Sequence, residues 1–291
     1  MRDTRPLTLG LGLVLGALAG ALPAQVQAGL RLDQIVQTLS SVPAGRDILE
    51  RARKSWGLAQ TSQVGNYLRW GQVSKTDAVL TRHFDPTTGK EERNRQVVVY
   101  LRRDMPLEET VLDLAHELVH AVEPPLWDPY DPDLTPARYV RVSIEGKGGE
   151  ADAVVQECRV ASNLMPLVNA TVRARLSDRC KRYQTPATPV DRGLVVKDFY
   201  AVGAWKSKLL ERLGAEKTAL PLITGTEPLL YSSTGRTPYP VALVDEFDQM
   251  NEVACANSRR REAAGALRSL ASGPPDETSR FLRRRCHDQG D

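Results

Sequence analysis

Residues 104–125 of this 291-residue chain read DMPLEETVLDLAHELVHAVEPP. Apolar side chains recur through this stretch every three or four residues, the pattern of a helix with one buried face. Pro106 suits the first turn of such a helix, and the pair Pro124 and Pro125 ends it. The run at 96–101, rich in β-branched residues, is typical of a buried strand. The sequence therefore predicts a strand followed by an amphipathic helix.

Within that helix, His116-Glu117-Leu118-Val119-His120 has the form H-E-x-x-H. Residues four apart on a helix project from one face about 6 Å apart, so the two imidazoles can bind one metal ion. Glu117 can then take a proton from a water on that ion. An ordinary amphipathic helix would explain neither the pairing of the histidines nor the glutamate between them.

A catalytic zinc ion needs a third protein ligand and an open position for water. One class of H-E-x-x-H enzymes has a third histidine six residues after the second, but Leu126 occupies that position here. His83 falls in a predicted turn and His287 lies four residues from the C-terminal residue. We therefore expect both of these histidines to be exposed and the third ligand to be a carboxylate.

Two glutamates of the next predicted helix, residues 149–164, are candidates for that ligand. Glu150 opens this helix, 30 residues beyond His120, and the small residues around it favour close packing on the first helix. Glu157 lies two turns later on an apolar stripe, where a carboxylate needs a partner. We expect Glu157 to accept the N–H of a ligand histidine, or to be the third ligand if Glu150 is not.

These residues resemble the gluzincins, zinc peptidases in which H-E-x-x-H is followed by a glutamate ligand. The resemblance covers about residues 94–165 and implies Zn²⁺ held by His116, His120 and Glu150, with Glu117 as general base. The larger gluzincins often carry an aspartate four residues after that glutamate, where this chain has Val154. The run from Glu150 to Ala153 is closer to small gluzincins with a glutamate-x-x-alanine helix.

The fold that we expect is α+β and zincin-like. A small twisted sheet would lie above the H-E-x-x-H helix and the glutamate-ligand helix, and the C-terminal half would be helical. Residues 1–28 form a leader, 29–185 the metal-site region, and 186–291 a mainly helical region packed on the same domain. We expect a long connection over 124–148 and one helix over 195–213. The strand at 96–101 is expected to pair with an extended substrate, as edge strands do.

The first 28 residues look like an export signal. Arg2 and Arg5 precede an apolar stretch over residues 7–22, and residues 26–28 fit a small-residue cleavage site, with cleavage after Ala24 as the alternative. An uncleaved anchor is the other interpretation. Nothing later is long and apolar enough to cross a bilayer. The sequence predicts a periplasmic or secreted protein with no stable membrane span after leader removal.

The cysteine count agrees with export. Cys158, Cys180, Cys255 and Cys286 make an even number, which in an exported chain argues for two disulfides. Three connectivities exist. We favour Cys158–Cys180 and Cys255–Cys286, because each bond would join neighbouring predicted helices.

The formal net charge of +3 argues against a nucleic-acid partner. The arginines at 259–261 and 283–285 are local clusters, which we interpret as solvated helix faces.

The sequence thus predicts an exported metallopeptidase that hydrolyses peptide or protein substrates with a metal-activated water. One alternative is a zincin-like zinc-binding protein with little or no turnover, in a binding or structural role. Another is a metal-dependent hydrolase of a non-protein substrate, such as cell-wall material. The resemblance also implies a Tyr, His or Arg that stabilises the oxyanion. The tyrosines considered for this role are Tyr130, Tyr139, Tyr183, Tyr231 and Tyr239.

Overall fold

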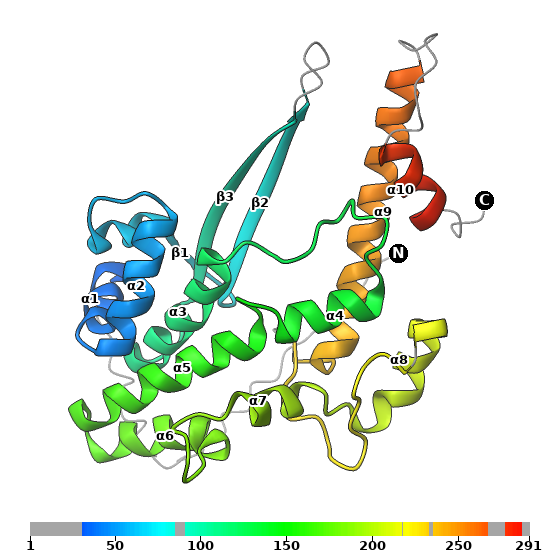
Figure 1. Ribbon diagram of the computed structural model, residues 1–291. Coiled ribbons are helices and arrows are strands. Elements are labelled where there is room, and N and C mark those ends of the chain that lie inside the picture. The colour runs from blue at the N-terminus through cyan, green and yellow to red at the C-terminus, as the bar shows by residue number, and fades with distance from the viewer. Residues whose placement is uncertain (1–30, 85–90, 217, 233–234, 267–276, 287–291) are drawn as a thin grey trace, which may run out of the picture.

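The computed structural model describes residues 31–84, 91–216, 218–232, 235–266 and 277–286 (Figure 1). The leader expected at residues 1–28 lies outside this part of the chain. The protein is α+β, with a small three-stranded mixed sheet and many helices. The strands are β1 (Leu68–Gly71), β2 (Lys75–Phe84) and β3 (Glu91–Arg102). The α-helices are α1 (Leu32–Ser40), α2 (Pro43–Ser55), α3 (Leu107–Val122), α4 (Pro136–Glu145), α5 (Glu150–Leu164), α6 (Ala170–Cys180), α7 (Arg192–Phe199), α8 (Lys206–Leu213), α9 (Tyr239–Ala266) and α10 (Glu277–Arg285).

The strand order in the sheet is β1-β3-β2. β2 and β3 form a long antiparallel hairpin, and β1 pairs in parallel with the end of β3. Val97, Val99 and Leu101 of β3 are buried while the residues between them are not, the alternation of a strand with one covered face. That face packs on α3, so the predicted strand-then-helix unit is confirmed.

The expectation that residues 96–101 form an edge strand is wrong. β3 is the central strand, paired with β2 on one side and, from Val99 to Arg102, with β1 on the other. Among the described residues, β2 pairs only with β3, so β2 carries a free edge. β1 likewise pairs only with β3 in the described part of the chain, so a substrate strand would have to pair with β1 or with β2.

α3 lies at the centre of the main hydrophobic core. It packs against α5 on one side, α1 and α2 on another, and β2 and β3 above. Leu114, Ala115 and Leu118 of α3 are fully buried, which confirms the apolar stripe. The same core continues through α7 and α8 into the first turns of α9. The metal-site region and the C-terminal region thus share buried side chains.

Two expected elements differ in the structure. The connection over 124–148 contains helix α4, whose first turn has Pro136 and whose N-cap is Thr135, accepting a hydrogen bond from Arg138 N–H. The helix expected over 195–213 is broken into α7 and α8. Gly203, between them, has a φ of +49°, and Val202 N–H donates to Ile223 O at 2.9 Å. This long-range pairing, which no local pattern reveals, ends α7.

Both expected disulfides are confirmed. Cys158–Cys180 joins α5 to α6, and Cys255–Cys286 joins α9 to the residue after α10. Disulfides of this kind are typical of an oxidising compartment outside the cytosol. No helix in the described part of the chain is both long enough and apolar enough to cross a bilayer.

The second disulfide lies in a small separate core of α9 and α10, against which Tyr130 of the segment before α4 packs. Figure 1 shows α10 lying beside α9. Phe281 of α10 contacts the ring of Tyr130, with centroids 5.7 Å apart. Arg285 donates to the carbonyl of Asp131 at 2.8 Å, and Arg284 forms an ion pair with Asp133. The arginines at 283–285 are therefore more than a solvated face, because two of them hold this segment.

Removal of the Cys255–Cys286 disulfide should loosen the segment that α10 holds. We expect Cys255→Ser/Cys286→Ser to lose about 2–5 kcal/mol of stability. Amide hydrogen exchange over residues 127–134 should accelerate in this double variant. The matched control is Cys158→Ser/Cys180→Ser, which should leave exchange over 127–134 unchanged. Unchanged protection in the first variant would show that α10 does not hold the segment.

Candidate metal centre

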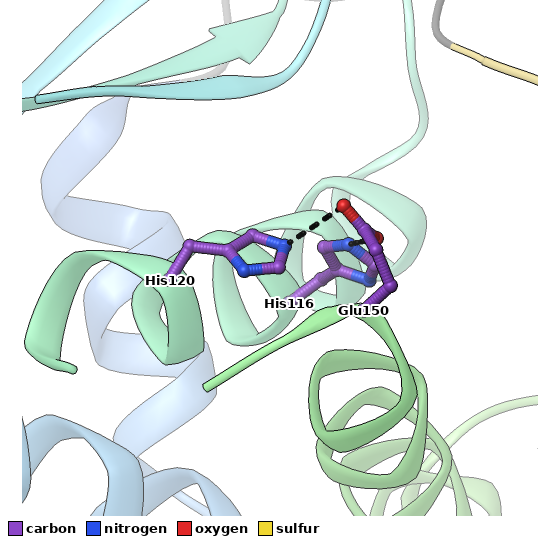
Figure 2. A group of neighbouring side chains, drawn as sticks. All are labelled: His116, His120 and Glu150. Carbon is purple, nitrogen blue, oxygen red and sulfur yellow. Dashed lines mark ion pairs between the residues drawn. The ribbon is translucent and has the colours of Figure 1, made fainter. Parts of the chain in front are cut away.

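His116 and His120 project from one face of α3, one turn apart, with ring centroids 5.1 Å apart. Glu150 is the first residue of α5, which packs along α3. Figure 2 shows the two imidazoles converging on the Glu150 carboxylate. Nε2 of His116 lies 3.3 Å from Glu150 Oε2, and Nε2 of His120 lies 3.6 Å from Glu150 Oε1. One ligand atom from each residue lies within 4.8 Å of the others.

A tight turn between α4 and α5 brings Glu150 to this position. Gly148 has a φ of +75°, and a Cβ atom there would lie 2.4 Å from Cβ of Glu123. A Cβ at Gly149 would lie 2.5 Å from the carbonyl oxygen of Ser143. Because neither position has room for a side chain, the two glycines allow the backbone to pass over the end of α3.

The other nitrogen of each imidazole has its own partner. Nδ1 of His116 donates to Glu157 Oε2 at 3.2 Å, and Nδ1 of His120 donates to the carbonyl of Gly148 at 2.9 Å. Histidines that bind metals usually donate their second N–H in this way, which fixes the ring and leaves the other nitrogen for the metal. Both rings thus present Nε2 toward Glu150.

Glu157 contacts Nδ1 of His116, the ring nitrogen that faces away from Glu150, so it orients this imidazole without facing the centre of the cluster. Its other oxygen accepts a hydrogen bond from Arg179, which also pairs with Asp113 at 3.2 Å. Of the two carboxylates left open by the sequence, Glu150 is the one at the convergence of the imidazoles. Glu157 takes the place expected for a partner of a ligand histidine.

The buried polar atoms of the cluster fit a cation. Oε2 of Glu150 is buried and has no hydrogen-bond partner, since its approach to His116 lacks hydrogen-bond geometry. Such an atom is costly unless a further group satisfies it. Two imidazole nitrogens and one carboxylate are a ligand set found in catalytic zinc sites. The His116, His120 and Glu150 group could therefore bind a metal ion.

The charges of the cluster shift its protonation equilibria. Burial by itself disfavours charged histidine, yet the neighbouring carboxylates of Glu150 and Glu157 raise the pKa of His116 well above its ordinary value. Burial likewise opposes a charged His120, but the charge of Glu150 raises the pKa of His120. Burial also acts against ionised Glu150, and the two histidines reverse this and lower the pKa of Glu150.

Glu117 is buried beside the cluster and is held by β2. The hydroxyl of Thr76 lies 2.9 Å from Glu117 Oε2 and 2.8 Å from the Glu117 carbonyl oxygen. Burial raises the pKa of Glu117, while the charges of His116 and His120 oppose this rise. A raised pKa suits a general base, because such a group must both accept and release a proton.

A cavity of about 550 Å³ opens above these side chains. His116, Glu117, His120 and Glu150 line it, together with the free edge of β2, the residues after α3, and the faces of α4 and α9. The side chain of His83 and the whole of His287 lie outside the described part of the structure. The cavity gives the cluster access to ligands from solution.

Of the five tyrosines considered for the oxyanion, Tyr139 and Tyr239 line this cavity. The charge of Glu150 and burial raise the pKa of Tyr239, which therefore keeps its proton at neutral pH. Burial and the nearby charge of Glu246 raise the pKa of Tyr139. Tyr130 lines a neighbouring cavity. No sequence signal singled out Tyr239 or Thr76, because both reach the cluster from distant parts of the chain.

If Glu150 is a metal ligand and Glu157 only holds His116, substitution of Glu150 should weaken zinc binding more than substitution of Glu157. We expect Glu157→Gln to weaken zinc binding about 10- to 100-fold, the usual cost of losing an outer partner. Glu150→Gln should weaken it more, because it changes the ligand itself. Competition with a chromogenic chelator measures both affinities. Glu211→Gln, on an exposed face of α8, is the control. A larger loss of zinc affinity in Glu157→Gln than in Glu150→Gln would make Glu157 the ligand and Glu150 the supporting residue.

Protonation of His116 and His120 should make the stability of the metal-free protein and the affinity for zinc change in opposite directions with pH. In the metal-free protein, the raised pKa values of His116 and His120 add stability that is complete below pH 6.5 and is lost as the pH rises through those values. Zinc needs neutral imidazoles, so its affinity should rise over the same range. Thermal unfolding at several pH values, with and without zinc, measures both trends. If the stability of the metal-free protein and the affinity for zinc changed in the same direction with pH, the protonated histidines would not be the groups that bind zinc.

Comparison with known proteins gives no relative from which a function could be transferred. No protein-family model, curated protein or solved structure matches this chain. The function must therefore be argued from the residues of the site.

Proposed function

We propose that this protein is an exported zinc-dependent metallopeptidase of the zincin-like, gluzincin type. One observation carries the proposal: the convergence of His116, His120 and Glu150 beside a buried Glu117, at the base of an open cavity. Zinc that serves only to hold a fold is usually enclosed by four protein ligands. Three ligands facing a cavity leave a position for water and substrate, as catalysis requires.

Zinc bound by His116, His120 and Glu150 would polarise a substrate carbonyl and lower the pKa of a bound water. The chain's own residues supply the remaining chemistry. Glu157 and the Gly148 carbonyl hold the two imidazoles with Nε2 facing the cavity. This preorganisation spares the protein the cost of orienting the ligands during the reaction.

Glu117 is the group that would move the proton. Thr76 fixes its carboxylate through Oε2 at 2.9 Å. Because burial raises the pKa of Glu117, this carboxylate can accept a proton from water and later give it to the leaving amine. Both transfers are needed to break a peptide bond.

Tyr239 is the group that would stabilise the negative charge that develops on the carbonyl oxygen. It is the first residue of α9 and lines the same cavity as Glu117. Its ring packs edge-on against Phe199, with centroids 5.0 Å apart, which fixes its direction. A phenol that keeps its proton at neutral pH can donate a hydrogen bond to an oxyanion.

The free edge of β2 favours a peptide over other substrates. Residues 74–78, at and just before the start of this strand, line the cavity next to the metal cluster. An extended peptide can hydrogen-bond to such an edge through its main chain, whereas a glycan cannot reproduce the pattern. A metal-dependent hydrolase of a non-protein substrate and a zinc protein without turnover remain as the two outcomes to be separated by experiment.

Substitution of the general base separates turnover from metal binding. We expect Glu117→Gln to keep zinc and to lower kcat about 10²- to 10⁴-fold on fluorogenic peptides, because the proton acceptor is lost. Elemental analysis and steady-state kinetics of the zinc-loaded chain measure the two quantities. Full activity with bound zinc in this variant would refute the mechanism, and a wild-type protein that binds zinc but cleaves no peptide would refute the function.

The role of Tyr239 has its own signature. Tyr239→Phe should lower kcat about 10²- to 10³-fold with little change in KM, because the hydrogen bond forms mainly in the transition state. The control is Tyr231→Phe, since Tyr231 is 41% exposed and does not line the metal cavity. A loss confined to KM would instead make Tyr239 a substrate-binding residue.

A further inference from the structure

The metal cavity continues into a larger one along α9. The second cavity has a volume of about 1240 Å³ and shares Trp127 and Glu246, among other residues, with the first. Beyond the residues that the two cavities share, the second is lined by Met250 and Val253 of α9 together with polar residues such as Gln249 and Asn257. The two cavities therefore form one groove that starts at the metal cluster and extends well beyond it.

Glu246 lies where the two cavities meet, two turns after Tyr239 on α9. Its carboxylate lies close enough to Tyr139 for its charge to raise the pKa of that phenol, and the buried ring of Tyr139 packs 5.0 Å from that of Trp127. Burial raises the pKa of Glu246, and the charge of Glu150 raises it further. Glu246 is nevertheless an exposed residue, and its side chain faces the water of the groove.

Glu246 differs from nearby carboxylates in having no cation. Glu123 pairs with Arg51 and Lys147, each at 2.9 Å or less, and Glu157 pairs with Arg179. No lysine, arginine or histidine in the described ranges forms an ion pair with Glu246. A carboxylate that lines a groove with no cation paired to it leaves its negative charge available, so this part of the groove favours a cationic ligand.

Arg95 lines the same part of the groove but is engaged elsewhere. Its two terminal nitrogens donate to the carbonyls of His120 and Ala121, at 3.1 and 3.0 Å. These bonds hold the guanidinium at the C-terminal end of α3, where the helix dipole favours a positive charge. Arg95 therefore leaves the Glu246 carboxylate available to a ligand.

We propose that Glu246 binds the lysine or arginine side chain of an extended peptide substrate, near the bond that is cleaved. This inference rests on the proposed function and names its substrate class. The groove continues past Glu246 toward Met250 and Val253, so the peptide chain continues as well. The cation therefore belongs to a side chain within the peptide and not to its terminal amine.

The test compares matched peptides that carry lysine, arginine, norleucine or glutamate at one position. Each peptide is acetylated and amidated, so that only the side chain differs in charge. We expect the wild-type, zinc-loaded protein to have a higher kcat/KM for lysine and arginine than for norleucine. Glu246→Gln should reduce this ratio about 10- to 100-fold, the worth of a hydrogen bond to a charged group. Glu246→Lys should reverse the preference toward glutamate.

The matched control is Glu252→Gln, which changes an exposed glutamate on the same helix outside both cavities. It should leave the ratio at the wild-type value. An unchanged ratio in Glu246→Gln, or an equal loss on all four peptides, would overturn the proposal. If only peptides with a free amino terminus respond to Glu246→Gln, the cation is the terminal amine and the proposal is wrong.

A binding measurement keeps this inference separate from the proposed function. Fluorescence anisotropy with zinc-loaded Glu117→Gln and the same blocked peptides reports recognition without cleavage. Tighter binding of the lysine peptide, abolished by adding Glu246→Gln, supports the site even if the wild-type protein cleaves nothing. Absence of any charge-dependent binding overturns it even if the wild-type protein is a peptidase.

Discussion

The packing of the first turn of α5 on α3 is the constraint on which the site depends. It requires the backbone at Gly148 and Gly149 to pass where side chains would overlap Glu123 and the Ser143 carbonyl. The same passage places the Gly148 carbonyl 2.9 Å from Nδ1 of His120. One turn therefore delivers the third candidate ligand and orients the second. Glu123 secures this turn from outside, because it pairs with Arg51 of α2 and with Lys147.

The first disulfide strengthens the other side of the cluster. Cys158 follows Glu157 in α5, and Cys180 follows Arg179 in α6. The covalent bond thus lies next to the ion pair that holds Glu157 against His116. A buried ion pair is stable only when its geometry is well maintained, because desolvation of both charges opposes it. The disulfide keeps the two helices at the spacing that this ion pair needs.

The second disulfide stabilises the wall of the groove. α10 is held against α9 by Cys255–Cys286, and it holds in turn the segment between α3 and α4 through Arg284 and Arg285. That segment contributes Leu126 and Trp127 to the wall of the groove, opposite α9. The metal cluster and the groove therefore have separate supports. A change in the C-terminal helix pair can alter the groove while the cluster stays intact.

The sequence by itself determined the local features of this protein. The H-E-x-x-H spacing, the helix that carries it and the preceding strand follow from periodicity, because helix and strand periods are properties of neighbouring residues. The two disulfides and the placement of Glu150 at the start of α5 were also predicted from the chain. The α+β class followed from the same elements, although α4 and the break between α7 and α8 did not.

Only the tertiary structure decided which distant groups meet the cluster. It placed Glu150, and not Glu157, at the convergence of the imidazoles, and it made β3 the central strand and β2 an edge strand. It also brought Thr76, Tyr239 and Glu246 to the cavity from other parts of the chain. Their positions depend on how helices and strands cross, which is set by burial of side chains summed over the whole core. Local periodicity carries no record of those crossings, so the sequence could name Tyr239 only as one of five tyrosines and gave no signal for Thr76 or Glu246.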